Sequence, residues 1–381
     1  MKRILFFNDT MAVGGTEVIL VNLLNHLATR NCVITLLLPQ PSRDNVLIVK
    51  LSQAITVKYI SDGHSSHLMK KLNENLMIFL PSFFNNCRGI KEQDYDEVVC
   101  FKECFYARLF SKWSIPKVLW IHNILYRRQY DAQSLRERLS VWLNKKQLRI
   151  SQRSYDRYNK VICVSDACKS VYIDILHNGT EPHQDITVLY NAIDVESIIK
   201  QSKEPIDPLP QDITKFILLT RNSPEKRIDR LLNVVTRLNR AGYKLRVYVL
   251  GEGISETILY NAGLDDIVTF LGHVDNPFPY IVQCNWMVCV SERESFSLAL
   301  LEAMTLKTPV ITTDCGGPSN IVEGGKYGIL VDNSTEGIYE GMKKVLDDPQ
   351  LSVQYSAHLD EAIERYDYDG WLKSVESLLS V

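Results

Sequence analysis

Short apolar runs alternate with amphipathic segments along most of the chain. The runs Arg3–Phe7, Val33–Leu38 and Val118–Ile121 are aliphatic or β-branched and are bounded by polar residues. Such runs are typical of strands that are buried on both faces of a parallel sheet. The segment Val18–Leu27 instead carries its apolar residues at helical spacing. Strands and helices in alternation predict an α/β fold with doubly wound parallel sheets.

The same patterns continue to the end of the chain. Further strands are predicted at residues 55–60, 98–101, 161–165, 216–220, 245–250, 267–271, 286–290, 310–313 and 329–331, and further helices at 68–79, 228–238, 296–304 and 371–379. A polar stretch with Pro205, Pro208 and Pro210 separates two halves. Since 381 residues also favour two domains, we predict a boundary near residue 200.

The stretch from residue 285 to residue 322 predicts a βαβ unit with two polar turns, Ser291–Ser295 and Gly316–Pro318. In open parallel sheets, ligands bind beyond the carboxyl ends of the strands, where both turns are expected. Glu294 and Glu302 are eight residues apart, or about 12 Å if the gap is helical. A glycosidase pair lies roughly 5–9.5 Å apart. The spacing favours two contacts along an extended ligand such as a nucleotide sugar, although a Glu at a helix N-terminus and one solvated Glu explain it too.

Three other places carry candidate chemistry. Gly14 and Gly15 lie in a polar loop between a strand and a helix, where a phosphate can approach the backbone and Thr16 could cap the helix. Arg221 and Lys226 flank a similar loop, a pattern that suits a diphosphate. His122 follows a strand directly. The alternatives are a plain strand–helix turn, solvated surface cations and a capping histidine.

The pattern Glu294-x7-Glu302, then Pro309-Val310-Ile311 and Asp314-x-Gly316-Gly317, resembles the signature of retaining glycosyltransferase family 4. The resemblance implies the GT-B fold, in which two Rossmann-like domains face a cleft. It assigns residues 1–195 to an acceptor-side domain and residues 196–365 to a nucleotide-sugar-binding domain, with a terminal helix, 366–381, packed back on the first.

The resemblance also implies roles for individual residues. Arg221 and Lys226 would contact the donor phosphates, Glu294 the sugar hydroxyls and Glu302 the ribose. His122 would lie near the donor sugar. Glycines would shape the loops around the donor: Gly14, Gly15, Gly251 and Gly272.

The chain departs from the family pattern at four positions. Ser295-Phe296-Ser297 stands in the donor site where Gly-Phe-Gly is usual, although serine hydroxyls can cap the following helix. Thr220 and Arg227 also replace usual glycines, which concerns the shape of the Arg221–Lys226 loop.

Composition narrows the classes of partner. The net charge of −2 predicts no nucleic-acid partner. The nine cysteines mostly lie in apolar runs, as expected of buried thiols in a reducing, cytoplasmic compartment. No signal peptide or 18-residue apolar run is visible. The pairs Asp94-x-Asp96 and Asp367-x-Asp369 do not follow suitable strands, so we expect neither a required metal nor a cofactor.

Residues 126–160 carry ten basic and three acidic side chains, with Trp142 and several leucines between them. A basic amphipathic helix with Trp can lie on an anionic membrane surface, possible here at its cytoplasmic face, while a solvated helix face is the alternative.

The sequence as a whole predicts a retaining glycosyltransferase. It would move a sugar from a nucleotide diphosphate sugar, with UDP the expected nucleotide, to an acceptor hydroxyl. The expected acceptor is a lipid-linked precursor of a surface polysaccharide or O-antigen. No protein nucleophile stands out, and a front-face mechanism needs none. A GT-B epimerase or phosphorylase, or a catalytically silent binding domain, remains the alternative.

Overall fold

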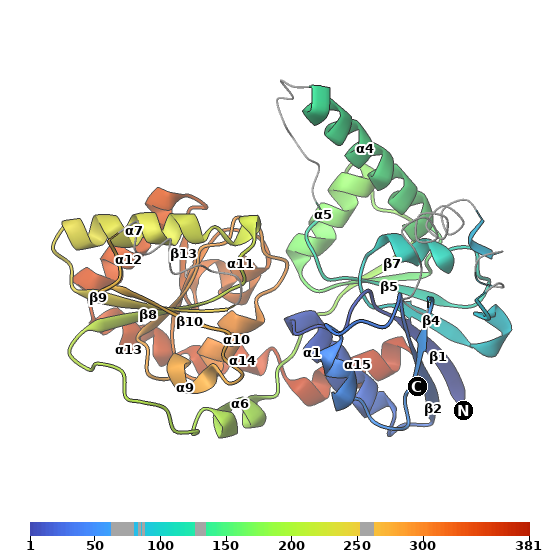
Figure 1. Cartoon of the computed structure of the whole chain (residues 1–381), viewed down its shortest axis with the longest axis horizontal. Helices are drawn as coiled ribbons and strands as arrows, with labels where there is room; N and C mark the ends of the chain where they lie inside the picture. The colour runs from blue at the N-terminus through green and yellow to red at the C-terminus, as the bar shows by residue number, and fades with distance from the viewer. Residues whose placement is uncertain (62–79, 83–84, 86–87, 126–134, 252–262) are drawn as a thin grey trace. The chain divides into compact units, whose positions relative to one another are not determined.

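The structure is a computed structural model that describes residues 1–61, 80–82, 85, 88–125, 135–251 and 263–381. The chain divides into two compact units (Figure 1). The N-terminal unit comprises Met1–Tyr190 together with Leu372–Val381, and the C-terminal unit comprises Asn191–Trp371. The predicted helix 68–79 lies outside the described residues.

A parallel sheet forms the centre of the N-terminal unit. Its described strands lie in the order β3-β2-β1-β4-β5-β6-β7, and every neighbouring pair is parallel. They are β1 (Lys2–Phe7), β2 (Cys32–Leu38), β3 (Thr56–Tyr59), β4 (Glu97–Cys100), β5 (Lys117–Ile121), β6 (Lys160–Cys163) and β7 (Asp185–Val188). β4 and β5 are buried along their whole length, which explains their continuous apolar sequence.

Helices and short 3-10 turns connect these strands. The described ones are α1 (Gly15–Leu27), η1 (Val46–Lys50), η2 (Glu92–Asp94), η3 (Phe105–Leu109), α4 (Leu135–Tyr155) and α5 (Asp166–His177). α1 buries Leu20, Leu23, Leu24 and Leu27 on one face, as its helical spacing predicts.

The end of the chain belongs to the N-terminal unit. The last helix, α15 (Tyr368–Leu378), passes from one unit to the other, and residues 372–381 belong to the N-terminal unit. The carboxylate of Glu376 accepts hydrogen bonds from His26 Nε2 at 2.6 Å and from Arg30 Nε at 2.5 Å. Lys160 Nζ donates to the carbonyl of Leu378 at 2.9 Å. These bonds fix the terminal segment on α1 and β6.

The C-terminal unit contains a second parallel sheet, ordered β10-β9-β8-β11-β12-β13. Its strands are β8 (Thr214–Leu219), β9 (Leu245–Leu250), β10 (Val268–Gly272), β11 (Trp286–Cys289), β12 (Val310–Thr313) and β13 (Ile329–Val331). Its described helices are α6 (Val195–Gln201), η4 (Pro224–Lys226), α7 (Ile228–Arg240), α9 (Phe278–Ile281), α10 (Leu298–Thr305), α11 (Gly317–Ile321), η5 (Glu323–Gly325), α12 (Thr335–Asp347), α13 (Gln350–Ser356) and α14 (Leu359–Glu364).

One apolar core joins the sheet of the C-terminal unit to α7 and α12. Leu231, Val235 and Leu238 of α7 are fully buried in it, together with Met342 of α12. The indole of Trp286 on β11 is also buried. Burying such side chains removes apolar surface from water at roughly 25 cal/mol per Å², which holds the helices on the sheet.

Both sheets reverse their strand order at one place. In the N-terminal unit the chain builds outward from β1 to β3 and then returns to β4 beside β1. In the C-terminal unit it builds outward from β8 to β10 and returns to β11 beside β8. Ligands of open α/β sheets bind at the carboxyl ends of strands that flank such a reversal. The loops after β1 and β4, and after β8 and β11, are therefore where a site is expected.

The fold class predicted from the sequence is confirmed, with shifts at element ends. α10 begins at Leu298 rather than at Phe296, so a non-helical segment occupies half of the gap between Glu294 and Glu302. The 12 Å estimate assumed a helix throughout and does not apply. The edge strand β7 was missed because it is short and half-exposed.

Two other features bear on the expectations from composition. The described cysteines are free thiols, and all except Cys104 are buried, as their apolar surroundings predict. Among the described helices, none combines the length and the apolar character that a membrane crossing needs.

Candidate functional site

The loops after β8 and β11 meet through a pair of opposite charges. The ammonium of Lys226, at the end of η4, contacts the carboxylate of Glu294, which lies between β11 and α10. Both side chains are largely buried, with exposed fractions of 20% and 14%. Sequence reasoning placed these two residues in one site, and the structure brings them together at the strand reversal of the C-terminal unit.

Glu294 is held by backbone bonds between two loops. Its amide donates to the carbonyl of Cys315 at 2.9 Å, and the amide of Gly317 donates to its carbonyl at 2.8 Å. A Cβ at Gly317 would lie 2.0 Å from the carbonyl oxygen of Ser295, so this close approach admits only glycine. The Gly316-Gly317 motif therefore fixes the loop that presents Glu294.

The Lys226 loop is fastened to the same segment. The amide of Glu292 donates to the carbonyl of Glu225 at 2.8 Å, and the hydroxyl of Ser223 donates to the Glu225 carboxylate at 2.7 Å. Arg221 lies 3.5 Å from that carboxylate, but 72% of its side chain is exposed. The two predicted cations thus differ: Lys226 is buried and fixed, while Arg221 projects toward solvent.

Arg227 occupies the position after Lys226 where glycine is usual, and it adopts a backbone conformation that glycine favours. Its backbone is left-handed, with φ 49° and ψ 45°, a conformation that costs roughly 1–2 kcal/mol for a residue other than glycine. Its guanidinium lies 2.7 Å from Asp229 and 3.5 Å from Glu292. The loop keeps the shape that glycine favours, and these ion pairs offset part of the strain.

Electrostatics keep Lys226 charged. Burial alone would lower its pKa, but the carboxylate of Glu294 raises the pKa above its usual range. The first turn of α7 begins directly after this loop; its N-cap residue, Arg227, makes no side-chain cap, and the carboxylate of Asp229 accepts a hydrogen bond from its own amide in that turn. A largely buried ammonium favours an anion, so this corner of the C-terminal unit suits a phosphate group that can compete with Glu294.

A small cavity adjoins the pair. It is lined by Thr220, Lys226, Ser291, Glu294 and Ser297 together with apolar residues of β8, β11 and α10. Of the segment Ser295–Ser297, which stands where Gly-Phe-Gly is usual, only Ser297 lines this cavity.

The three residues of the Ser295–Ser297 segment have different surroundings. Phe296 is buried, with its ring 5.9 Å from that of Tyr366, so it anchors the loop in the core. Ser297 is the N-cap of α10, but its side chain caps no amide, contrary to the expectation from the sequence. Ser295 lends its carbonyl to the contact with Gly317.

Glu302 lies inside α10 and does not line this cavity. Burial raises the pKa of its carboxyl to about 7, and no described cation or hydrogen-bond donor counters that effect. The structure therefore separates Glu302 from the Lys226–Glu294 pair. A carboxyl in such surroundings is stabilised by a partner that donates hydrogen bonds, such as a hydroxyl.

Gly251 and Gly272 end the neighbouring strands β9 and β10. Gly251 has φ 140°, and a Cβ there would lie 1.5 Å from the carbonyl oxygen of Thr220. Its amide donates to the carbonyl of Gly272 at 2.8 Å, and Gly272 itself has φ 68°. Gly251 requires glycine because its backbone lies against Thr220, whereas at Gly272 only the left-handed backbone favours glycine, since a Cβ there would meet open space.

In the N-terminal unit, Gly14 is the N-cap of α1, and Gly15 is the first residue of the helix. No side chain caps this N-terminus, so Thr16 does not act as the predicted cap. A Cβ at Gly14 would lie 2.4 Å from Oε2 of Glu17, which folds back over the loop. The carboxylate of Glu17 thus occupies the space beside Gly14 at the start of α1.

His122 follows β5 and is buried, with the rings of Phe101 and Trp120 beside it at centroid distances of 4.7 and 5.8 Å. Burial, and then the charge of Lys102, lower the pKa of His122 to about 3. The imidazole is therefore neutral at physiological pH, so it can both donate and accept a hydrogen bond.

Sequence reasoning missed a cluster of charged groups after β1 and β4. Lys102 Nζ lies 3.2 Å from Asp9 and 3.6 Å from Glu17. The carboxylate of Glu103 accepts hydrogen bonds from the amide of His122 at 2.7 Å and from the Asn123 side chain. Burial raises the pKa of Glu103 to about 7.

A signal for this cluster was present in the sequence. Lys102 and Glu103 follow the apolar run Val98–Phe101 directly, at a carboxyl end next to the strand reversal.

The two Asp-x-Asp pairs of the sequence make local structural contacts. Asp96 accepts a hydrogen bond from Arg3 NH2 at 2.7 Å, and this contact lowers its pKa to about 2. Asp367 caps the amide of Gly370 at 2.6 Å. The two Asp-x-Asp pairs thus hold local structure, and within the described residues no group of His, Cys, Asp or Glu has the arrangement of a metal site.

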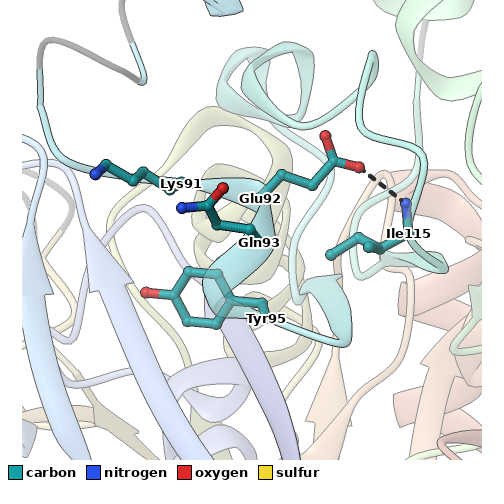
Figure 2. A pocket seen from close by; sticks show the side chains of 5 residues that line it. All are labelled: Lys91, Glu92, Gln93, Tyr95 and Ile115. Carbon is teal, nitrogen blue, oxygen red and sulfur yellow. Dashed lines mark hydrogen bonds between the residues drawn. The ribbon is translucent and has the colours of Figure 1, made fainter.

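Figure 2 shows a hollow of the N-terminal unit that is lined by Lys91, Glu92, Gln93, Tyr95 and Ile115. Glu92 Oε1 accepts a hydrogen bond from the amide of Ile115 at 3.2 Å. These residues precede β4 and β5, so the hollow lies at the amino ends of the strands. It is therefore separate from the loops after β1, β4 and β5.

Comparison with known proteins identifies the class. Residues 13–197 match the family described as "Glycosyltransferase Family 4", and residues 214–348 match the family described as "Glycosyl transferases group 1". Together the matches cover most of the chain, one in each unit. With its two parallel-sheet units, the chain belongs to the family 4 glycosyltransferases, which have the GT-B fold.

The chain is similar to curated enzymes over about half its length. It is 28% identical over 205 residues to N-acetylgalactosamine-N,N'-diacetylbacillosaminyl-diphospho-undecaprenol 4-alpha-N-acetylgalactosaminyltransferase of Campylobacter jejuni, covering 52% of this chain and 54% of that protein. It is 27% identical over 202 residues to poly(ribitol-phosphate) alpha-N-acetylglucosaminyltransferase of Staphylococcus aureus, covering 50% and 40%. The chain thus matches about half the length of such relatives.

Solved structures show the fold over the whole chain. Sucrose-phosphate synthase from Thermosynechococcus elongatus superposes with a TM-score of 0.77 at 16% identity, covering 100% of this chain and 98% of that one. Anabaena HepE in complex with UDP-glucose superposes with a TM-score of 0.73 at 18% identity, covering 100% of both. At these identities the likeness concerns the fold alone.

Proposed function

We propose that this protein is a retaining glycosyltransferase that moves a sugar from a UDP-sugar to an acceptor hydroxyl. The observation that carries the proposal is the largely buried Lys226–Glu294 pair at the strand reversal of the C-terminal unit, beside the N-terminus of α7. A cation and a carboxylate within one loop cluster match the two chemical parts of such a donor, its diphosphate and its sugar.

Lys226 would stabilise the departing diphosphate. When the bond between C1 of the sugar and the phosphate oxygen breaks, negative charge develops on that oxygen. A fixed ammonium stabilises this charge more than it stabilises the bound donor, which lowers the barrier. Arg221, at the solvent side of the same loop, would add a second contact. An incoming diphosphate would compete with Glu294 for Lys226.

Glu294 would then bind the sugar. Once the diphosphate competes for Lys226, the Glu294 carboxylate can accept hydrogen bonds from sugar hydroxyls. Glu302, whose pKa burial raises to about 7, would gain most from ribose hydroxyls as hydrogen-bond donors. The strand ends at Gly251 and Gly272 would approach the nucleobase through backbone groups.

The transfer step needs no protein nucleophile. The acceptor oxygen would bond to C1 on the face from which the diphosphate leaves, and the hydroxyl proton would pass to the departing phosphate oxygen. The anomeric configuration is then retained. The printed names of both curated relatives specify alpha-linked products, which supports this stereochemistry. We propose no metal and no cofactor, because Lys226 and Arg221 supply the positive charge.

The N-terminal unit would supply the acceptor side. The neutral imidazole of His122 can exchange hydrogen bonds with sugar hydroxyls without adding charge. The Gly14–Gly15 loop would face the donor diphosphate and the acceptor. The Campylobacter relative is named for a diphospho-undecaprenol substrate and the staphylococcal one for poly(ribitol-phosphate). We therefore propose a lipid-linked or polymeric glycan as the acceptor.

A donor panel tests the proposal. The protein is incubated with UDP-, GDP- and ADP-sugars, with and without undecaprenyl-diphosphate-linked sugars, and released nucleoside diphosphate is measured. We expect UDP release that depends on the acceptor, and a product with retained configuration by NMR. Conversion of the donor sugar without an acceptor would indicate an epimerase. A requirement for inorganic phosphate would indicate a phosphorylase, and binding without turnover of any donor a silent domain.

A further inference from the structure

One face of α4 is exposed and strongly basic. Six described side chains of this helix are exposed: Arg138, Leu139, Trp142, Lys146, Arg149 and Arg153. At about 100° per residue, these six positions fall within an arc of roughly 100° around the helix axis. We call this set the α4 stripe.

The C-terminal end of α4 packs on the N-terminal unit. Ser154 and Tyr155 are buried, and the hydroxyl of Tyr155 donates to the carbonyl of Cys104 at 3.5 Å. Figure 1 shows α4 lying outside the sheet of its unit, near α5. The stripe therefore lies along an exposed side of a helix that is anchored at its C-terminal end.

Two apolar side chains lie within the basic stripe. Leu139 is 56% exposed and Trp142 is 54% exposed. The other four tryptophans of the chain, Trp113, Trp120, Trp286 and Trp371, are each less than 7% exposed. Lys146 Nζ lies 5.1 Å from the centre of the Trp142 ring. Moving exposed Trp and Leu side chains from water to the interfacial region of a bilayer lowers the free energy.

The charge on the stripe has one sign. It holds four cations, and no acidic residue occupies this arc among the described side chains. The whole chain has a net charge of −2, so the excess is local. Stretched over about 22 Å of helix, the cations form a line that suits a flat array of phosphate groups.

We propose that the α4 stripe docks this protein on an anionic lipid surface. The cations would bind lipid phosphates, and Trp142 and Leu139 would enter the headgroup region. A nucleic acid would satisfy the cations but would give no reason for the exposed Leu139, so the lipid surface accounts for more of the face. The inference needs only α4 and does not depend on the proposed transfer reaction.

Trp142 offers a direct readout. The full-length protein is mixed with phosphatidylglycerol vesicles at low salt, and tryptophan emission and sedimentation are followed. We expect co-sedimentation and a blue shift of the emission, which Trp142→Phe removes because the four other indoles are already buried. Phosphatidylcholine vesicles should bind weakly, and about 1 M salt should release the protein, because the Debye length falls to about 3 Å.

Charge reversal tests the cations. In the triple variant Lys146→Glu, Arg149→Glu, Arg153→Glu, partitioning should fall by about 100-fold or more, since each basic residue near an anionic surface contributes roughly a factor of five. The matched control reverses three exposed lysines elsewhere in the same unit, Lys50, Lys91 and Lys112, and should retain most of the binding. Circular dichroism confirms that each variant is folded.

Three results would overturn the proposal. The first is wild-type protein that stays in the supernatant at low salt. The second is an equal loss of binding in the control triple, which would indicate only a response to total charge. The third is tighter binding to duplex DNA than to vesicles with unchanged Trp142 emission, which would identify a nucleic-acid surface instead.

Discussion

The buried polar groups at the carboxyl edges of the two sheets differ in the protonation state that their surroundings favour. In the C-terminal unit, opposite charges from two loops meet, and Glu294 raises the pKa of buried Lys226. In the N-terminal unit, burial lowers the pKa of His122 to about 3 and raises that of Glu103 to about 7. The C-terminal edge holds a fixed cation against one carboxylate. The N-terminal edge combines the ion pairs of Lys102 with two neighbouring groups, His122 and Glu103, whose neutral forms burial favours.

The difference matches two chemical tasks. A fixed cation is useful where negative charge grows during a reaction, because its orientation costs nothing further at that moment. Neutral hydrogen-bonding groups are useful for hydroxyls, which carry no charge that must be balanced. In the proposed function, Lys226 of the C-terminal unit stabilises the departing diphosphate and His122 of the N-terminal unit exchanges hydrogen bonds with hydroxyls, and experiments can separate these two proposals.

The largest effect is expected from removing the fixed charge. Lys226→Met should lower turnover by about 10²–10³-fold, the range seen when one group that stabilises developing charge is lost. Arg221→Met should cost less, because its side chain is 72% exposed. Initial rates of nucleoside diphosphate release measure both.

Lys244→Met is the matched control, because Lys244 is an exposed lysine of the same unit outside the site. Turnover within a factor of three of wild type for Lys226→Met would refute the assignment of the leaving group.

The backbone that presents Glu294 should be nearly as sensitive. Gly317→Ala forces a Cβ to within 2.0 Å of the Ser295 carbonyl oxygen, so the loop must move. We expect a loss of about 1–3 kcal/mol in the free energy of unfolding, together with lower turnover. Urea denaturation measures the first and initial rates the second.

Gly324→Ala is the comparison variant, because Gly324 has φ 63° but open space around its Cβ position. It should affect stability modestly and turnover hardly at all. Equal losses of turnover in both variants would show that general destabilisation, rather than the position of Glu294, causes the effect.

The neutral groups of the N-terminal unit predict a pH dependence. His122 has a folded-state pKa of about 3 against an ordinary value of 6.5, so its contribution to stability is present above pH 6.5 and is lost as pH falls below it. Glu103 has a folded-state pKa of about 7 against 4.5, so its contribution has the opposite sign, and stability rises as pH falls from 7 to 4.5. Between pH 6.5 and 4.5 the two contributions largely cancel.

Glu103→Gln should expose the His122 contribution. Its free energy of unfolding should decline by about 1 kcal/mol more per pH unit than that of wild type between pH 6.5 and 4.5. Chemical denaturation at several pH values measures this slope. Identical slopes for the two proteins would mean that Glu103 is ionised in the folded protein across this range.

The sequence predicted the C-terminal edge better than the N-terminal one. Glu294, Lys226 and the Gly316-Gly317 turn each lie within a short motif that the family resemblance covers, although Lys226 and Glu294 meet only because β8 pairs with β11. Asp9 and Glu17 likewise meet Lys102 only when β1 and β4 pair, and the resemblance assigned them no role. Pairing of strands distant in sequence leaves no spacing between these residues to detect, so the position of Lys102 and Glu103 directly after a strand was their one local signal.

The sequence also could not predict the direction of individual side chains or the backbone conformation at Arg227. Phe296 belongs to the motif that replaces Gly-Phe-Gly, yet its ring packs against Tyr366 in the core. Arg227 replaces a usual glycine, yet it adopts the left-handed backbone that glycine favours. In both cases packing and ion pairs decide the outcome, and neither can be read from residue type.

A comparison of UDP with uridine tests the central claim, that Lys226 binds the diphosphate of the donor, most directly. Calorimetric titrations of wild type and Lys226→Met give the extra affinity that the diphosphate contributes in each protein. The account predicts that UDP binds wild type much more tightly than uridine does, and that Lys226→Met loses most of this difference while its affinity for uridine is unchanged. The account is contradicted if the difference survives intact in Lys226→Met, or if wild type binds UDP no more tightly than uridine.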